Sequence, residues 1–302
     1  MTILTISSQV VFGHVGNSVA DFALRRLGME VIAIPTVILS NHKGYPDAVG
    51  EATPAARLKD YLAALERRGV LDRLSAVQTG FFANTAQAET VFAHLRELRR
   101  TRPELPIIID PVMGDKGRLY VEAGLVDQFR TAAPELASLV TPNAFEAATL
   151  ADDTLASPED MAQRLKARGF GSGLITSAET LSPDTGKRGV YCFDQTGTAM
   201  IEHRPVAFER EPNGVGDFVA ALSAGLYGLE QPLVARTQQI CAALVVLLEQ
   251  TRALGLRELA LVQAQEAWTS ALSSGSSGRA FPAAGQSEAD DAAGTITRAT
   301  KA

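Results

Sequence analysis

The chain has 302 residues, of which 46% are hydrophobic and 21% charged, and its formal net charge is −6. These values are typical of a soluble globular protein with a sizeable core, organised as one large domain or two small ones. No dense cluster of lysine and arginine is present, which argues against nucleic acid as a partner. The start of the chain lacks the features of a signal peptide, and no apolar run is long enough to span a membrane. We therefore expect a cytoplasmic protein with no membrane partner.

The two cysteines, Cys192 and Cys241, stand apart in the sequence. Neither belongs to a CxxC pair, and none of the four histidines has the spacing of a zinc site. We predict two reduced, buried thiols, as is usual in cytosolic proteins.

Six short apolar segments are predicted to be buried strands, because they are bounded by turn or cap residues and mostly do not alternate in polarity. They are residues 3–7, 31–35, 76–81, 106–110, 137–141 and 173–177. Four segments between them have apolar residues at helical spacing, namely 16–28, 56–69, 85–100 and 157–169. Alternation of strand and helix predicts βαβ units in a doubly wound α/β sandwich, with helices on both faces of a mostly parallel sheet.

The pattern changes after residue 187. Residues 188–194 and 198–206 are predicted to form an antiparallel hairpin at the edge of the sheet. Three helices are expected to follow, one from about residue 215, one over 232–252 and one over 257–271. Residues 273–302 are rich in Gly, Ser and Ala, and we expect a disordered tail after a single domain over 1–272.

The stretch "EPNGVGDFVAALSAGLYG" at 211–228 places two glycines and a carboxylate directly before an apolar helix. A helix start offers unpaired N–H groups, and Gly214 and Gly216 carry no side chain that would keep an anion away from them. Asp217 can accept a proton from a hydroxyl group while these N–H groups hold a phosphoryl group. Taken alone, the pattern is also that of a turn with an aspartate cap.

Polar residues also follow two predicted strands. Asp110 ends one strand and Thr141 the next, at the edge where open α/β sheets bind ligands. Asn143 and Glu146 lie three residues apart at the start of a new helix. An amide and a carboxylate at this spacing can hold water-coordinated Mg²⁺, or they can form a capping box. Neither a Walker motif nor a dinucleotide fingerprint is present.

Together these motifs resemble those of known kinases. "DPVMGDKG", "NAFE" and "PNGVGD", in this order, resemble the ribokinase-like kinases. The segments "ISSQVVFGHVGNSVADFALRRLG", "TVILSNHKGY" and "QTGFFA" are similar to those of pyridoxal kinases, and the resemblance runs from Thr2 to Leu272. It implies a ribokinase-like three-layer sandwich and ATP-dependent phosphorylation of the 5′-hydroxymethyl group of pyridoxal. It also implies Mg²⁺ and a homodimer, and it leaves open a monovalent cation.

The resemblance assigns catalytic and nucleotide-binding roles. Asp217 would be the base, and an anion hole would be formed by Gly214, Val215 and Gly216. Asp110, Asn143 and Glu146 would belong to the magnesium and triphosphate network, with Mg²⁺ held by Asp110 and Glu146 through water. The ATP-binding residues would further include Thr141, Thr176, Ser177, Arg204, Pro205, Val206 and Ala207.

The resemblance also assigns a substrate pocket. Ser8 would hydrogen-bond the pyridine ring, and the pocket would be lined by Val15, His42 and Phe81. Residues 37–50, with Lys43 and Gly44, would form part of a flap over the substrate. Many relatives have tyrosine at the position of Phe81, and some have lysine at that of Thr176. These departures leave the preference among pyridoxal, pyridoxine and pyridoxamine open.

Two other functions are compatible with part of the pattern. A hydroxymethylpyrimidine kinase would share the fold and phosphorylate a similar ring, but that family often has a cysteine in the anion-hole motif. A protein that binds pyridoxal phosphate without catalysis is expected to have a damaged motif. Gly214, Gly216 and Asp217 are all present here.

Overall fold

The structure is a computed structural model that describes residues 1–154, 157–178, 188–229 and 231–274. Its centre is a nine-stranded sheet with the order β11-β10-β9-β8-β5-β4-β1-β2-β3. The strands are β1 (Thr2–Val10), β2 (Glu30–Leu39), β3 (Gly50–Ala52), β4 (Leu74–Thr79), β5 (Ile107–Ile109), β8 (Leu139–Val140), β9 (Gly173–Ile175), β10 (Arg188–Phe193) and β11 (Thr198–His203).

The six strands predicted from sequence form the parallel centre of this sheet, from β2 to β9. The predicted hairpin is confirmed as the antiparallel pair β10 and β11, which begins with Arg188 opposite His203. At the other edge, β3 pairs antiparallel with β2, so the predicted flap 37–50 consists of the connection of a short hairpin, 40–49, and the strand ends beside it. A separate small hairpin joins β6 (Gly114–Asp115) and β7 (Arg118–Leu119).

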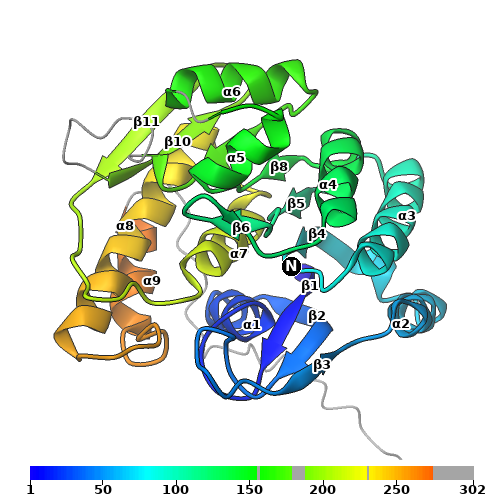
Figure 1. Ribbon diagram of the computed structural model, residues 1–302, viewed down its shortest axis with the longest axis horizontal. Helices are drawn as coiled ribbons and strands as arrows, with labels where there is room; N and C mark the ends of the chain where they lie inside the picture. Colours follow the sequence, from blue (N-terminus) through cyan, green and yellow to red (C-terminus); the bar gives the residue numbers. More distant parts are fainter. Residues whose placement is uncertain (155–156, 179–187, 230, 275–302) are drawn as a thin grey trace, which may run out of the picture.

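Helices cover both faces of the sheet, which confirms the predicted three-layer α/β sandwich (Figure 1). One face carries α2 (Ala55–Arg67), α3 (Thr85–Thr101), α4 (Ala123–Leu136), α5 (Ala144–Ala151) and α6 (Pro158–Ala167). The other carries α1 (Asn17–Arg26), α7 (Val215–Leu226), α8 (Leu233–Ala253) and α9 (Gln265–Ser274). A 3-10 turn, Leu71–Arg73, precedes β4. No helix in the described part of the chain combines the length and apolar character needed to cross a membrane.

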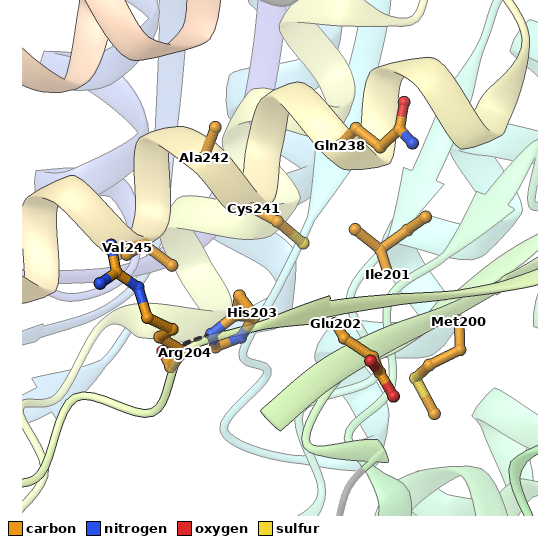
Figure 2. A pocket seen from close by; sticks show the side chains of 9 residues that line it. All are labelled: Met200, Ile201, Glu202, His203, Arg204, Gln238, Cys241, Ala242 and Val245. Carbon is orange, nitrogen blue, oxygen red and sulfur yellow. Dashed lines mark hydrogen bonds between the residues drawn. The ribbon is translucent and has the colours of Figure 1, made fainter. Parts of the chain in front are cut away.

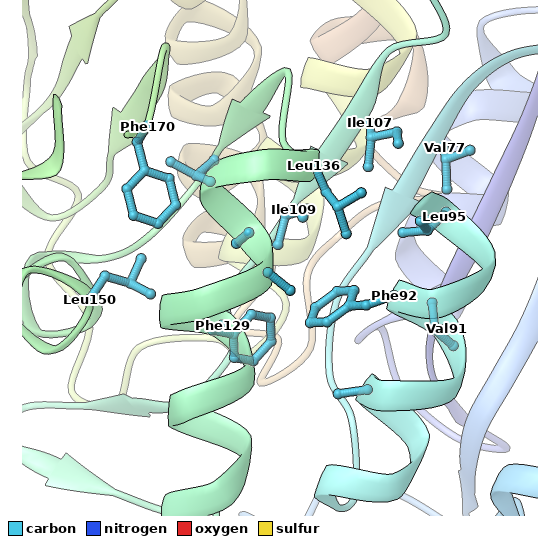
Figure 3. Close-up of a cluster of buried hydrophobic side chains, with 14 of the residues drawn as sticks. Val77, Val91, Phe92, Leu95, Ile107, Ile109, Phe129, Leu136, Leu150 and Phe170 are labelled. Carbon is cyan, nitrogen blue, oxygen red and sulfur yellow. The ribbon is translucent and has the colours of Figure 1, made fainter. Parts of the chain in front are cut away.

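Aromatic side chains fill both layers between sheet and helices. On the first face, Phe92 of α3 and Phe129 of α4 pack edge to face with ring centroids 5.8 Å apart (Figure 3). On the second, Phe218 of α7 packs edge to face against Trp268 of α9 at 5.3 Å, and Trp268 Nε1 donates to the carbonyl of Leu261 (3.0 Å). Because Phe218 follows Asp217 directly, this buried pair fixes the first turn of α7.

Two helix assignments differ from the sequence prediction. The last helix begins at Gln265, eight residues after the predicted start at 257. The intervening residues are held instead by non-helical contacts, among them a bridge between Glu258 and Asn213 and a bond from Ala260 N to Thr251 Oγ1 (2.9 Å). Helix α4 was not predicted; it contains Pro134, a residue that normally breaks a helix.

The predicted tail 273–302 lies outside the described residues from position 275 onward. Its first two residues, Ser273 and Ser274, belong to α9.

Candidate active site

Predicted site residues follow the carboxyl ends of neighbouring parallel strands. Phe81 comes after β4, Asp110 after β5, Thr141 after β8, and Thr176 after β9. The carboxyl ends of parallel strands meet at one edge of the sheet, so these residues share that edge. The amide N–H of Thr176 donates to the carbonyl of Pro142 (2.8 Å), which ties the last two of these ends together.

The N-terminus of α7 lies at the same site and exposes unpaired N–H groups. The N–H of Phe218 donates to the carbonyl of Gly214 (2.9 Å), so the groups before it have no carbonyl within the helix. Gly214 has φ 87°, and a Cβ there would lie 2.1 Å from the carbonyl oxygen of His14. A Cβ on Gly216 would meet nothing within 4 Å. Gly214 is therefore required by the backbone, whereas Gly216 leaves the helix start open to a ligand.

Asp217 lies in the first turn of α7 and is half-buried. Its carboxylate accepts a hydrogen bond from the N–H of Gly16, the residue that caps α1. Burial raises the pKa of Asp217, and this hydrogen bond opposes the rise. A carboxylate with a raised pKa is a better acceptor for a hydroxyl proton, as a general base requires.

Asp110 faces a space shared by several acidic groups. Its side chain is only 4% exposed, and the Thr141 hydroxyl donates to its Oδ1 (3.2 Å). Burial and the charges of Glu146 and Asp217 raise the pKa of Asp110. Burial raises the pKa of the Tyr120 hydroxyl, and the neighbouring carboxylates, Glu146 and Asp110 first among them, raise it further. Such a cluster attracts a cation, since each carboxylate repels the next.

Glu146 and Asn143 form the capping box at the start of α5. Glu146 Oε2 accepts from the N–H of Asn143 (2.9 Å), and Oε1 accepts from the N–H groups of Met113 (2.9 Å) and Gly114 (3.3 Å). Burial nevertheless raises the pKa of Glu146 to about 7. Of the two sequence interpretations, the capping box is thus present, and both carboxylate oxygens already accept N–H bonds.

The donor set suits a hydrated divalent cation better than a fully protein-bound one. Asp110 Oδ2 accepts no bond among the described residues, while Glu146 is engaged by backbone. No group of three or more His, Cys, Asp or Glu side chains in the described ranges is placed to hold a metal ion. Mg²⁺ tolerates this arrangement, because it keeps several of its own waters.

Two of the predicted substrate-binding residues lie next to the helix starts. A Cβ on Gly16 would lie 2.3 Å from Ser8 Oγ, so the Ser8 hydroxyl is directly against the residue that binds Asp217. Val15, beside Gly16, is buried. Phe81 is held at its N–H by Ser7 Oγ (3.2 Å) and at its carbonyl by Thr36 Oγ1 (2.6 Å).

The flap residues form a turn. The N–H of Gly44 donates to His42 Nδ1 (3.0 Å), and Arg210 Nη2 donates to the carbonyl of Gly44 (2.8 Å). Lys43, between them, is exposed. The structure therefore joins the predicted flap to the segment that precedes the predicted anion hole.

The predicted nucleotide segment 204–207 follows β11 and is exposed except for Val206. A pocket of about 450 Å³ lies between β11 and α8, and of the predicted site residues it includes Arg204 alone (Figure 2). A second pocket, of about 760 Å³, lies between the end of β1 and α1 and includes none of them. Ser177 is exposed and has φ 53°, in the left-handed region.

Sequence reasoning missed three contributors to the site. Gly16 lies within a quoted motif and Tyr120 lies three residues after another, but only tertiary contacts reveal their roles. Glu258 accepts hydrogen bonds from the N–H of His14 (3.0 Å) and the hydroxyl of Tyr45 (2.8 Å). No pattern in the sequence distinguishes it from a surface glutamate.

Comparison with known proteins supports the same interpretation. The model of the phosphomethylpyrimidine kinase family matches residues 28–239. A pyridoxal kinase of Rubrobacter xylanophilus is 36% identical over 88% of this chain and 93% of its own. A pyridoxine/pyridoxal/pyridoxamine kinase of Bordetella bronchiseptica is 34% identical over 86% of this chain and 92% of its own.

Among solved structures, a pyridoxal kinase of Leishmania donovani in complex with ADP and ginkgotoxin superposes with a TM-score of 0.78 at 28% identity. The superposition covers 88% of this chain and 95% of the other. It confirms the ribokinase-like fold implied by the sequence motifs. On the family match and these relatives, the chain belongs to the phosphomethylpyrimidine kinase family and, within it, to the pyridoxal kinases.

Proposed function

We propose that the protein transfers the γ-phosphoryl group of ATP to the 5′-hydroxymethyl group of pyridoxal, giving pyridoxal 5′-phosphate in vitamin B6 salvage. The observation that carries this proposal is the position of Asp217, beside the open start of α7 and bonded to the N–H of Gly16. Ser8, which lies against Gly16, would hydrogen-bond the substrate ring while Asp217 receives the hydroxyl proton.

Phosphoryl transfer depends on positioning and charge neutralisation more than on covalent chemistry. The N–H groups of Gly214, Val215 and Gly216 would hold the oxygens of the migrating group and stabilise the charge that develops on them. Asp217 would orient the hydroxyl for in-line attack and accept its proton. The flap residues His42, Lys43 and Gly44 would keep water out, since water in the site would hydrolyse ATP.

On the nucleotide side, Thr141, Thr176 and Ser177 would contact the phosphates, and the exposed segment 204–207 would lie beside the nucleotide. Mg²⁺ would be held by Asp110, with Glu146 acting through water, and would supply charge neutralisation on the phosphates. Two observations support this placement of Mg²⁺. Asp110 is buried and has one carboxylate oxygen that accepts no hydrogen bond among the described residues. Glu146 lies close enough for its charge to repel that of Asp110, and a bound cation would relieve this repulsion. The sequence leaves open whether the enzyme requires a monovalent cation. Comparing phosphorylation rates in K⁺ and Na⁺ salts tests this.

Side-by-side phosphorylation of pyridoxal, pyridoxine, pyridoxamine and hydroxymethylpyrimidine tests the proposal. We expect phosphorylation of pyridoxal that requires both ATP and Mg²⁺. The matching family is described as phosphomethylpyrimidine kinase, so hydroxymethylpyrimidine, which carries a related ring, is the second candidate substrate. A clear preference for that ring would overturn the assignment to pyridoxal, and failure to phosphorylate any of the four would favour a non-catalytic binding protein.

We also propose a homodimer that works in the cytoplasm. Four exposed apolar side chains, Val11, Phe12, Ile38 and Val49, lie at one end of β1, β2 and β3, and are 82%, 63%, 48% and 68% exposed. Backbone bonds from Val11 N to Leu39 O and Phe12 N to Ser40 O (both 2.9 Å), and from Ser40 N to Val49 O (2.7 Å), hold these segments side by side. A second copy would cover these apolar side chains. Light scattering tests it: the wild type should have twice the chain mass and Phe12→Asp the mass of one chain. A monomeric wild type would exclude the dimer.

A further inference from the structure

We propose that Glu258 is a positioning residue that latches the flap to the anion hole, so that binding of ATP and closure over the vitamer are coupled. The proposal rests on the proposed kinase function. Glu258 lies between α8 and α9, far in sequence from both the flap and α7. None of the sequence motifs includes it.

The carboxylate of Glu258 joins two segments that surround the substrate. Its Oε1 accepts from the hydroxyl of Tyr45, in the flap connection (2.8 Å), and its Oε2 accepts from the N–H of His14 (3.0 Å). His14 lies in the β1–α1 loop, which ends at Gly16, the residue that binds Asp217. One side chain therefore holds the flap on one oxygen and the loop at the catalytic base on the other.

The backbone of Glu258 makes the third connection, because it forms a parallel bridge with Asn213, the residue before Gly214. These connections are tightly packed. A Cβ on Gly13 would lie 2.5 Å from Glu258 Oε2, and one on Gly214 would lie 2.1 Å from the carbonyl of His14. With so little free space, a shift of the anion-hole loop displaces Glu258 and the flap with it.

Two arginines strengthen the same link. The guanidinium of Arg257 lies 4.5 Å from the centre of the Tyr45 ring, and Arg210 donates to the carbonyl of Gly44 (2.8 Å). The next residue after Arg210, Glu211, pairs with Lys116 (3.2 Å) and Arg188 (2.6 Å). Arg210 thus anchors the loop before the anion hole to the flap, and Glu211 anchors it to the β6–β7 hairpin and to β10.

This arrangement has a thermodynamic consequence. Because the flap is bonded to the carboxylate of Glu258 and the anion-hole segment to its backbone, a nucleotide that orders the loop also favours the closed flap. The affinity for the vitamer then rises when nucleotide is bound. If the hydrogen bond between Tyr45 and Glu258 were purely structural, its removal would lower the stability of the protein without changing this coupling.

Tyr45→Phe is the sharpest test, because it removes the hydroxyl bond to Glu258 and keeps the ring under Arg257. The dissociation constant of pyridoxal is measured with and without a non-hydrolysable ATP analogue. We expect the analogue to tighten pyridoxal binding in the wild type and to lose most of this effect in Tyr45→Phe, with about a 10-fold rise in the KM for pyridoxal. Hydrolysis of ATP without vitamer should rise. Tyr61→Phe, on the exposed surface of α2, should match the wild type in every measurement.

Glu258→Gln provides a second variant, with Glu104→Gln, at an exposed loop position, as its control. Its amide cannot accept from both partners as the carboxylate does, so its coupling should fall at least as far as in Tyr45→Phe. An unchanged coupling ratio in both variants, whether or not their melting temperatures fall, would overturn the latch. Wild-type protein that phosphorylates no vitamer would instead overturn the proposed function, so the two failures are distinguishable.

Discussion

The N–H of Gly16, at the start of α1, donates a hydrogen bond to the carboxylate of Asp217, at the start of α7. Two helix N-termini therefore meet at one carboxylate. Each helix start favours negative charge, and together they offset part of the cost of keeping Asp217 ionised in a half-buried position. The loop that carries Gly16 is also packed against Gly214, so the proposed base and the proposed anion hole are held in place by the same loop.

Replacing Asp217 by Asn should leave the fold intact and remove the proposed base. The Asn side-chain oxygen can still accept from Gly16, but the amide cannot take the hydroxyl proton. We expect kcat to fall by about 10²- to 10⁴-fold with nearly unchanged ATP affinity and melting temperature. Steady-state rates, nucleotide titration and thermal unfolding check this. A variant that keeps near-normal turnover would show that Asp217 is not the base.

Gly214→Ala and Gly216→Ala form a matched pair with opposite expectations. At Gly214 the added Cβ meets the His14 carbonyl at 2.1 Å and φ is 87°, so we expect a loss of stability of about 1–3 kcal/mol. At Gly216 the Cβ meets nothing within 4 Å, and alanine is the better helix former. That variant should melt at or above the wild-type temperature but lose phosphoryl transfer, since the methyl group occupies the approach to the anion hole. Full activity in Gly216→Ala would place the phosphoryl group elsewhere.

Asp110→Asn should make the ligand-free protein more stable and the enzyme inactive. The wild-type carboxylate is buried beside Glu146 and Asp217, and the asparagine oxygen can still accept from Thr141. Removing one of three clustered carboxylates is expected to raise the free energy of unfolding by about 1 kcal/mol in metal-free buffer. Added Mg²⁺ should stabilise the wild type more than the variant. Thermal unfolding with EDTA and with Mg²⁺ measures both effects, and equal stabilisation of the two proteins would argue against Asp110 as the metal-binding carboxylate.

The central sheet could be predicted because its six parallel strands are short apolar runs, each followed by a turn or cap residue. The strand-end residues Asp110 and Thr141 could be placed for the same reason, since topology brings those ends to one edge. Asn143 and Glu146 show the limit of this reasoning. Their spacing fits both a magnesium site and a capping box, and only the N–H donors of Met113 and Gly114 reveal how far the Glu146 carboxylate is already engaged.

The parts that could not be predicted depend on contacts between distant segments. Glu258 lies 244 residues from His14 and 213 from Tyr45. Local sequence periodicity cannot predict contacts between residues that are so far apart in the chain. The segment after residue 256 has enough apolar residues for a helix, but its backbone pairs with Asn213 and its side chains fill the layer below the sheet. Tertiary packing there overrides the local helix pattern.

The two cysteines should resist alkylation in the folded protein. Cys192 and Cys241 are both free thiols and are 1% and 3% exposed. Burial raises the pKa of Cys241 to about 12 and also raises that of Cys192, so almost no thiolate forms at pH 8. We expect a thiol reagent to label both cysteines rapidly in denaturant and neither of them rapidly in buffer at pH 8.

Because the thiolate is the reactive form and both thiols lie between β11, β10 and α8, slow labelling should follow transient opening of this edge of the sheet. Raising the pH from 8 to 9 should then increase the labelling rate while leaving the number of labelled thiols unchanged. Cys241→Ala assigns the signal, since it leaves one reactive thiol in denaturant. Labelling of Cys241 in native protein within seconds at pH 8 would mean that the pocket between β11 and α8 exposes its sulfur, and the raised pKa would be wrong.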